Sequence, residues 1–257
     1  MHNITAKQEL NQQLQSSSSV SPKLAETITQ KKQWTIEDVQ NIIEERQKKL
    51  ENQPLFKALD NSSQIDDLQA IAPHFYFFIL IFQDMLRLTH NLISDSVLKK
   101  VAASLMAEDA GHEQWYLFDI EQLNCKRDIS WVFGATHQPV RDFAYGLIGD
   151  LLYISDDRIR IIFPLVLEAT AKVFFKYLVD LVQRCGYNQS LQYFGTYHQE
   201  IEMNHNIHQD GNEELHNIEF DENTYREAVA FIHRCFDYFE CFADHLECQR
   251  ADGIGKE

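Results

Sequence analysis

The chain has 257 residues, of which 44% are hydrophobic, so it is long enough for one large domain or two small ones with a buried core. Its formal net charge of -16 disfavours nucleic acid and anionic membrane surfaces as partners, because both require clustered lysine and arginine. We therefore expect neither class of partner.

The N-terminal segment predicts a polar tail on a cytoplasmic protein. Met1 to Thr5 contain no basic region followed by an apolar run, so no secretory signal is expected. Residues 1–35 are rich in Gln, Ser, Lys and Asn, which predicts disorder. The longest apolar runs, 74–82 and 161–167, are far shorter than the roughly 20 residues of a membrane helix, so no membrane span is expected.

Residues 36–257 predict one all-helical domain. The first helical signal is Thr35, which can cap a helix whose first turn holds Glu37 and Asp38. Only nine Gly and five Pro, without Asn-Gly or Asp-Gly between alternating apolar residues, leave few places for hairpins. The predicted helices span about 36–58, 64–91, 95–124, 139–153, 157–185, 188–209 and 222–249.

Within the segment 188–209, the pattern His198-x3-Glu202-x2-His205 carries three potential metal ligands. At about 100° per residue, the three side chains fall within roughly 60° of one another on one helix face. Imidazole and carboxylate together suit iron, manganese or zinc. The alternative is a polar helix face turned to water, and His208 falls outside the shared face, as a residue beside the ligands.

A second pair of potential ligands, Glu108 and His112, is four residues apart in a segment predicted to be helical. The apolar run Val101–Leu105 precedes them, so their shared face is expected to be buried. The alternative is a hydrogen-bonded surface pair. Asp109 is a candidate for orienting a histidine from behind.

The third candidate is a single acid, Glu168, at the end of the apolar run Ile161–Leu167. A carboxylate there is costly to bury unless it is paired or coordinates a metal. The alternative is an exposed pair with Lys172, four residues later.

Together these residues, on three separate predicted helices, form a set of three carboxylates and three histidines. Facing helices of a bundle can use such a set to bridge two metal ions in a water-poor interior. The predicted ligands are Glu108, His112, Glu168, His198, Glu202 and His205.

On these residues, the chain resembles the haem-oxygenase-like diiron oxidases and oxygenases over about residues 37–250. In that family one core helix supplies a Glu and a His, a later helix a lone Glu, and a final core helix His-x3-Asp/Glu-x2-His. The stretch from Glu108 to Tyr116 resembles the family's Glu-Glu-x-Gly followed by His and an aromatic pair. Two departures, the short gap from Glu108 to His112 and Glu202 where Asp is commoner, suggest that one iron is held less firmly.

The resemblance implies a bundle of about seven helices, two Fe(II) ions or an Mn/Fe pair, O2 as co-substrate and a homodimer. The stretches Pro73–Arg87 and Glu108–Asp119 look most like a branch that acts on amino acids and includes a nitrile-forming enzyme. We therefore expect N-oxygenation, oxidative C–C cleavage or nitrile formation on a small amino acid or amine.

A small polar substrate needs a counter-charge for any carboxylate, and Arg87 is the candidate; the alternative, which residue statistics favour, is a plain surface arginine. Aromatic residues that could wall a pocket or simply fill the core are Phe77, Phe78, Phe82, Trp115 and Tyr116.

Two alternatives remain open on the same fold. One is a metal-free hydrolase of the TenA type, which uses a Cys nucleophile and acidic residues. The other is a non-catalytic iron-binding or interaction protein. The five cysteines form no Cys-x-x-Cys pair, so we expect most of them to be small buried hydrophobic residues.

Overall fold

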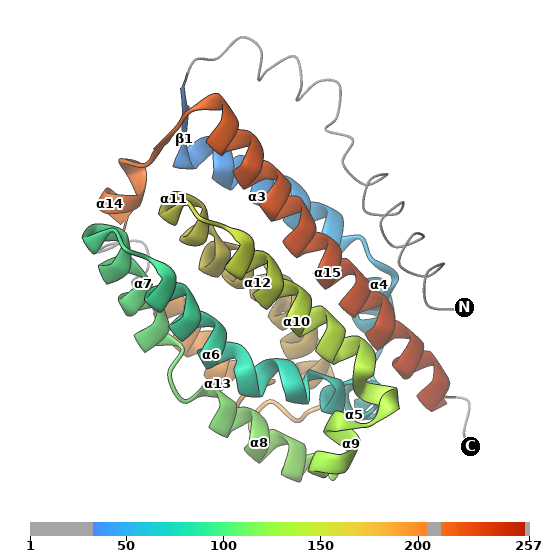
Figure 1. Ribbon diagram of the computed structural model, residues 1–257. Helices are drawn as coiled ribbons and strands as arrows, with labels where there is room; N and C mark the ends of the chain where they lie inside the picture. The colour runs from blue at the N-terminus through green and yellow to red at the C-terminus, as the bar shows by residue number, and fades with distance from the viewer. Residues whose placement is uncertain (1–32, 205–211, 255–257) are drawn as a thin grey trace, which may run out of the picture.

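The computed structural model describes residues 33–204 and 212–254, and most of them lie in α-helices (Figure 1). Within this part of the chain the only sheet is a pair of two-residue strands. The predicted all-α class is therefore confirmed.

The helices largely follow the predicted segments. The longer ones are α3 (Ile36–Glu51), α4 (Pro54–Asn61), α5 (Ile65–Ile71), α6 (Tyr76–Leu92), α7 (Ser96–Glu108), α8 (His112–Gln122), α10 (Gln138–Tyr153), α12 (Ile162–Arg184), α13 (Thr196–Asn204) and α15 (Glu222–Ile254). The short ones are η1 (Ala72–Phe75), α9 (Ile129–Phe133), η2 (Ala135–His137), α11 (Asp157–Arg160) and α14 (Asn212–His216).

Prolines divide two of the predicted helices. The segment 36–58 breaks before Pro54, the first residue of α4, and the segment 64–91 contains Pro73 within the 3-10 turn η1. Proline lacks an N–H donor and is tolerated in the first turn of a helix, so each one starts a new helical element.

The folded domain begins before residue 36. Strand β1 (Trp34–Thr35) pairs antiparallel with β2 (Glu219–Phe220). Trp34 is buried and stacks on Tyr225, with ring centroids 5.0 Å apart. The predicted tail therefore extends two residues too far at its C-terminal end, and its residues 1–32 lie outside the described part of the chain.

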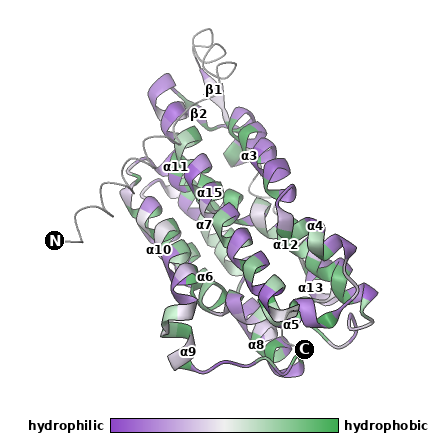
Figure 2. Ribbon diagram, turned by 90° about the vertical axis from the view of Figure 1, so that its right-hand side faces the viewer, coloured by the Kyte–Doolittle hydropathy of each residue, from purple (hydrophilic) through white to green (hydrophobic). Residues whose placement is uncertain are grey.

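Helix α3 shows how the sequence pattern directs the fold. The backbone N–H of Thr35 donates to Asp38 Oδ2 at 2.9 Å, which confirms the predicted cap. Ile36, Val39 and Ile43 recur at helical spacing and are buried. Hydrophilic residues cover the remaining face, as Figure 2 shows by colour.

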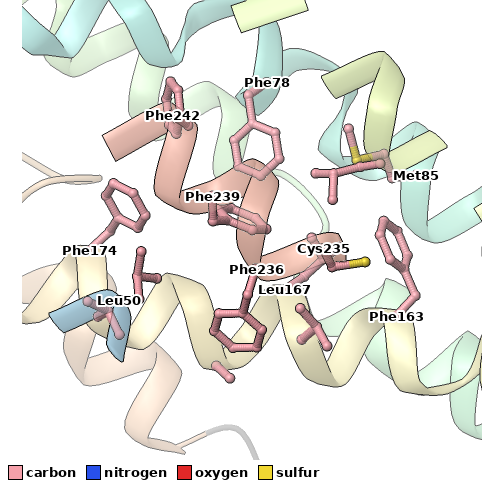
Figure 3. Packing of buried hydrophobic residues seen from close by; sticks show 14 of the residues in the cluster. Leu50, Phe78, Met85, Phe163, Leu167, Phe174, Cys235, Phe236, Phe239 and Phe242 are labelled. Atoms are coloured by element: carbon pink, nitrogen blue, oxygen red, sulfur yellow. The ribbon is translucent and has the colours of Figure 1, made fainter. Parts of the chain in front are cut away.

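The long helix α15 runs through the bundle and packs against α3, α5, α10 and α12 (Figure 1). Aromatic rings fill the space between α15 and its neighbours. Phe239 meets Phe78 at 5.8 Å and Phe242 meets Phe174 at 5.9 Å between ring centroids (Figure 3). These rings form one wall of the cavity described below.

One stretch of the described residues, Ile65–Leu92, is long and apolar enough by composition to cross a membrane, with a mean hydropathy of 1.3 in its most apolar window. In the fold this stretch is divided into α5, η1 and α6, and 56% of that window is buried inside the bundle. The protein core thus accounts for a little more than half of this window.

Candidate functional site

A cavity of about 370 Å³ lies between α6, α7, α8, α12, α13 and α15. Phenylalanine rings dominate its apolar wall, among them Phe75, Phe78, Phe174, Phe239 and Phe242. Acidic, basic and imidazole side chains also line the cavity. Such a concave, mostly apolar space with a few polar groups is typical of a small-molecule site.

Four of the six predicted ligands line this cavity: Glu108, His112, Glu168 and His198. They come from α7, α8, α12 and α13, so residues from three distant segments of the sequence meet at one site. Their role as metal ligands remains a prediction.

The side chains of the other two predicted ligands, Glu202 and His205, are outside the described part of the structure. Glu202 lies in helix α13, but the orientation of its side chain is outside the description. His205 and His208 lie outside the described residues altogether.

The predicted continuous helix 95–124 is wrong at the site. Helix α7 ends at Glu108, α8 begins at His112, and Gly111 between them has φ +95°, in the left-handed region. Glycine adopts this conformation without the clash of a Cβ. Glu108 and His112 therefore reach the cavity from two helix ends, and not from one shared helix face.

The two histidines are in direct contact. Nε2 of His198 lies 3.2 Å from Nδ1 of His112, and both side chains are buried. Nδ1 of His198 lies 3.1 Å from the carbonyl oxygen of Tyr193. Because a carbonyl only accepts, His198 donates through Nδ1, and in the neutral ring Nε2 carries the lone pair. In this structure Nε2 of His198 thus accepts from Nδ1–H of His112, and it is also the nitrogen that a metal ion would need.

Asp109 is also positioned to influence His112. Its Oδ1 lies 3.4 Å from Nδ1 of His112. A carboxylate at this place favours a proton on Nδ1 and leaves Nε2 of His112 as the acceptor. The geometry agrees with the orienting role considered for Asp109.

The segment before His198 is held by Asp119, which sequence reasoning did not single out. Asp119 is fully buried in α8 and accepts the backbone N–H groups of Gln192 at 2.6 Å and Phe194 at 2.8 Å. Burial raises the pKa of Asp119 to about 6, although these hydrogen bonds act to lower it. The sequence does contain an indication of a buried acid here, because Asp119 directly follows the apolar run Trp115–Phe118.

We call these two hydrogen bonds from Asp119 to the backbone the Asp119 clamp. They explain why the predicted helix 188–209 is wrong over residues 188–195. This stretch forms turns, and α13 starts only at Thr196. Backbone N–H groups that bond to a side chain from another helix are unavailable to a local helix. His198 then follows at the start of α13, with its own N–H bonded to Gln192 O at 3.2 Å.

Glu168 lines the cavity and also forms the pair with Lys172 that was its alternative role. Its Oε1 accepts from Nζ of Lys172 at 2.6 Å, which is the predicted pair four residues apart. Its side chain is 21% exposed, against 56% for Lys172, and both residues line the cavity. The pair therefore lies at the cavity and not on a remote surface.

Of the aromatic residues proposed as pocket walls, Phe78 and Phe82 line the cavity. Trp115 stands behind the site, stacked on the His112 ring with centroids 4.4 Å apart. Phe77 and Tyr116 serve the core: Phe77 packs edge-on against neighbouring rings, and the Tyr116 hydroxyl donates to the Ala72 carbonyl at 2.9 Å.

The prediction that Arg87 anchors the substrate is not supported by its position. Arg87 lies on the polar face of α6, where Nη1 pairs with Asp84 Oδ1 at 2.8 Å, and it is absent from the cavity lining. Both side chains of that pair are more than half exposed. Among the described residues, the basic side chains that line the cavity are Lys172 and Lys176.

As a test of fit, the donor set at the cavity is chemically suited to iron or manganese, and the His198 tautomer is suitable. Within the described ranges, however, no group of three His, Cys, Asp or Glu side chains is arranged to hold a metal ion. The side chain of Glu202 and the whole of His205 lie outside the described part of the structure.

Comparison with known proteins adds no assignment: no protein-family model matches the chain, and no curated protein matches it at a significant level.

Proposed function

We propose that this protein is a cytoplasmic non-haem diiron oxidoreductase of the haem-oxygenase-like type, which uses O2 to oxidise a small metabolite. The observation that carries the proposal is the meeting of Glu108, His112, Glu168 and His198 at one phenylalanine-walled cavity. Side chains that were predicted as ligands from separate segments line one mostly apolar cavity, the kind of place in which a helical bundle holds metal ions.

The metal ions would be held by these four side chains together with Glu202 and His205. Two Fe(II) ions, or an Mn/Fe pair, would supply the electrons with which O2 is activated. The expected substrate is an amino acid or amine, with N-oxygenation, oxidative C–C cleavage or nitrile formation as the outcome.

The chain's own contribution is positional. The Tyr193 carbonyl holds Nδ1 of His198, so Nε2 faces the His112 side. Asp119 holds the loop that carries this carbonyl. The phenylalanine wall excludes water and gives an apolar part of the substrate a surface to lie on.

The metal-free hydrolase is less well supported, because it needs a reactive thiol at the cavity. All five cysteines are in the described part of the chain, and none of them lines the cavity. Burial raises the pKa of the Cys125 thiol to about 11 and raises the pKa of the Cys235 thiol well above its ordinary value, which disfavours the thiolate nucleophile.

Anaerobic titration with Fe(II) tests the proposal. We expect about two irons per chain, as a dinuclear bundle site would hold. Free amino acids and fatty acids are then added one at a time, and the substrate among them should accelerate O2 consumption. His198→Ala and Glu168→Ala should each lower the iron stoichiometry. His90→Ala is the matched control, since His90 lies on α6 away from the cavity lining.

Unchanged iron binding and O2 consumption in both site variants would refute the site. Tight iron binding without any O2 consumption would instead favour the non-catalytic iron-binding protein.

A further inference from the structure

Besides its phenylalanine rings, the cavity is lined by two lysines and by the acidic residues Glu108, Asp109, Glu113 and Glu168. Lys172 and Lys176 are one turn apart on α12, and both line the cavity although their side chains are 56% and 53% exposed. Side chains that are half exposed and yet line a cavity lie at its opening. The two ammonium groups are the lysine cations of a cavity whose other charged lining residues are acidic, and each is paired with a glutamate.

The two lysines differ in what binds them. Nζ of Lys176 pairs with Glu51 at 3.3 Å and lies over the Tyr177 ring, so its partners come from outside the cavity. Nζ of Lys172 pairs with Glu168 at 2.6 Å, and Glu168 is itself a cavity residue. Lys172 is thus paired with a carboxylate that is also a predicted metal ligand.

A carboxylate that coordinates a divalent cation gives up much of its attraction for a neighbouring ammonium group, because the cation neutralises its charge. Lys172 would then be an incompletely paired ammonium beside an apolar cavity. Such a group attracts an anion, and a carboxylate is well suited to a single ammonium donor.

We propose that Lys172 binds the carboxylate of an amphipathic substrate, whose apolar body lies against the phenylalanine wall, and that Glu168 occupies Lys172 until a metal ion takes Glu168. The first half of this inference is carboxylate binding by Lys172, and the second half is the release of Lys172 when a metal ion takes Glu168. Only the second half rests on the proposed function. Together the two halves narrow the proposed substrate to an amino acid with an aromatic or alkyl side chain, since a simple amine offers Lys172 no carboxylate, and they make metal binding precede tight substrate binding.

The first half can be tested on the metal-free full-length protein by calorimetry, with 3-phenylpropionate as the anionic probe and 3-phenylpropanol as its neutral analogue. Glu168→Gln releases Lys172 and should tighten binding of the acid about fivefold, as expected for a partly exposed ion pair, without changing binding of the alcohol. Lys172→Gln should weaken binding of the acid by a similar factor.

Lys48→Gln is the charge-matched control, because Lys48 is exposed on α3 and absent from the cavity lining. The double variant of Glu168 and Lys172 should lose the gain seen in Glu168→Gln. If Glu168→Gln does not tighten binding of the acid, or if Lys172→Gln binds it as well as the unaltered chain, the role of Lys172 is wrong.

The second half is tested by anaerobic competition for Fe(II) against a chromophoric chelator. Lys172→Gln removes the competitor for Glu168 and should tighten Fe(II) binding about threefold to fivefold, while Lys48→Gln should not. If both variants bind Fe(II) no more tightly than the unaltered chain, the coupling between Lys172 and metal binding at Glu168 is wrong, while the proposed function stands. Failure of every variant to bind Fe(II) overturns the coupling and the proposed function, while the probe titrations still decide the role of Lys172.

Discussion

Nε2 of His198 lies 3.2 Å from Nδ1 of His112, although the two residues are 86 positions apart in the chain. Neither helix alone determines this contact. It depends on the Gly111 turn, which starts α8 at His112, and on the Asp119 clamp, which holds the loop before His198.

Replacement of Asp119 should therefore damage both stability and the site. Asp119→Ala leaves the buried N–H of Phe194 and the half-buried N–H of Gln192 without their acceptor, so we expect a loss of about 2–4 kcal/mol in the free energy of unfolding. Fe(II) affinity should fall about tenfold, since His198 loses its support. Urea unfolding and Fe(II) titration measure the two effects.

Asp180→Ala is the control for this prediction, because Asp180 is exposed on α12 and lies outside the cavity lining. It should change stability by no more than about 0.5 kcal/mol. Equal effects of the two substitutions would contradict the clamp.

Gly111→Ala should be destabilising without removing any contact. A Cβ at Gly111 meets no atom within 4 Å, so the penalty comes only from the positive φ of +95°. We expect a loss of about 1–2 kcal/mol in the free energy of unfolding. Gly111→Asn should lose less, because asparagine tolerates this region better. Thermal unfolding of the two variants orders the penalties, and equal stability of Gly111→Ala and the unaltered chain would refute the strained turn.

Two glycines of α10 should respond in opposite directions to the same substitution. A Cβ at Gly146 would lie 2.5 Å from Cε1 of Tyr238, whereas a Cβ at Gly149 meets nothing within 4 Å. Gly146→Ala should destabilise the chain by about 1–3 kcal/mol through overpacking of α10 against α15. Gly149→Ala should stabilise it by up to about 1 kcal/mol, because alanine favours a helix. Chemical unfolding of both variants checks the contrast, which a shared sign would contradict.

Buried histidines outside the cavity should make the protein sensitive to acid. Burial, together with the charge of nearby His245, lowers the pKa of His74 to about 3 and that of His137 to about 4. In the unfolded chain both titrate near pH 6.5, so below that pH the unfolded state binds more protons than the folded state. Stability should therefore fall as pH falls from about 6.5 toward 4, by up to about 1.4 kcal/mol per pH unit for each histidine.

The raised pKa of Asp119 in the folded protein opposes this trend. Its pKa of about 6 lies above the ordinary value of 3.8, so its contribution to stability rises as pH falls through the same window. We expect the two histidines to outweigh the single aspartate.

His137→Phe isolates the histidine contribution. Neither ring nitrogen of His137 has a hydrogen-bond partner among the described residues, and the ring packs on Trp131 at 4.5 Å, so phenylalanine can replace it. The variant should lose less stability than the unaltered chain between pH 6.5 and 4.5 in urea unfolding. An unchanged pH dependence would mean that His137 is not the source.

The sequence by itself determined the all-helical class, the start of α3 at its Thr35 cap and three candidate ligand segments, because helix periodicity, capping and residue chemistry are local properties. Only the tertiary structure decided that Glu108, His112, Glu168 and His198 share a cavity while Arg87 does not. The turn at residues 188–195 likewise required Asp119, whose bonds to this segment cross more than 70 positions of the chain. Contacts of that kind depend on how helices are placed against one another, which local periodicity does not encode.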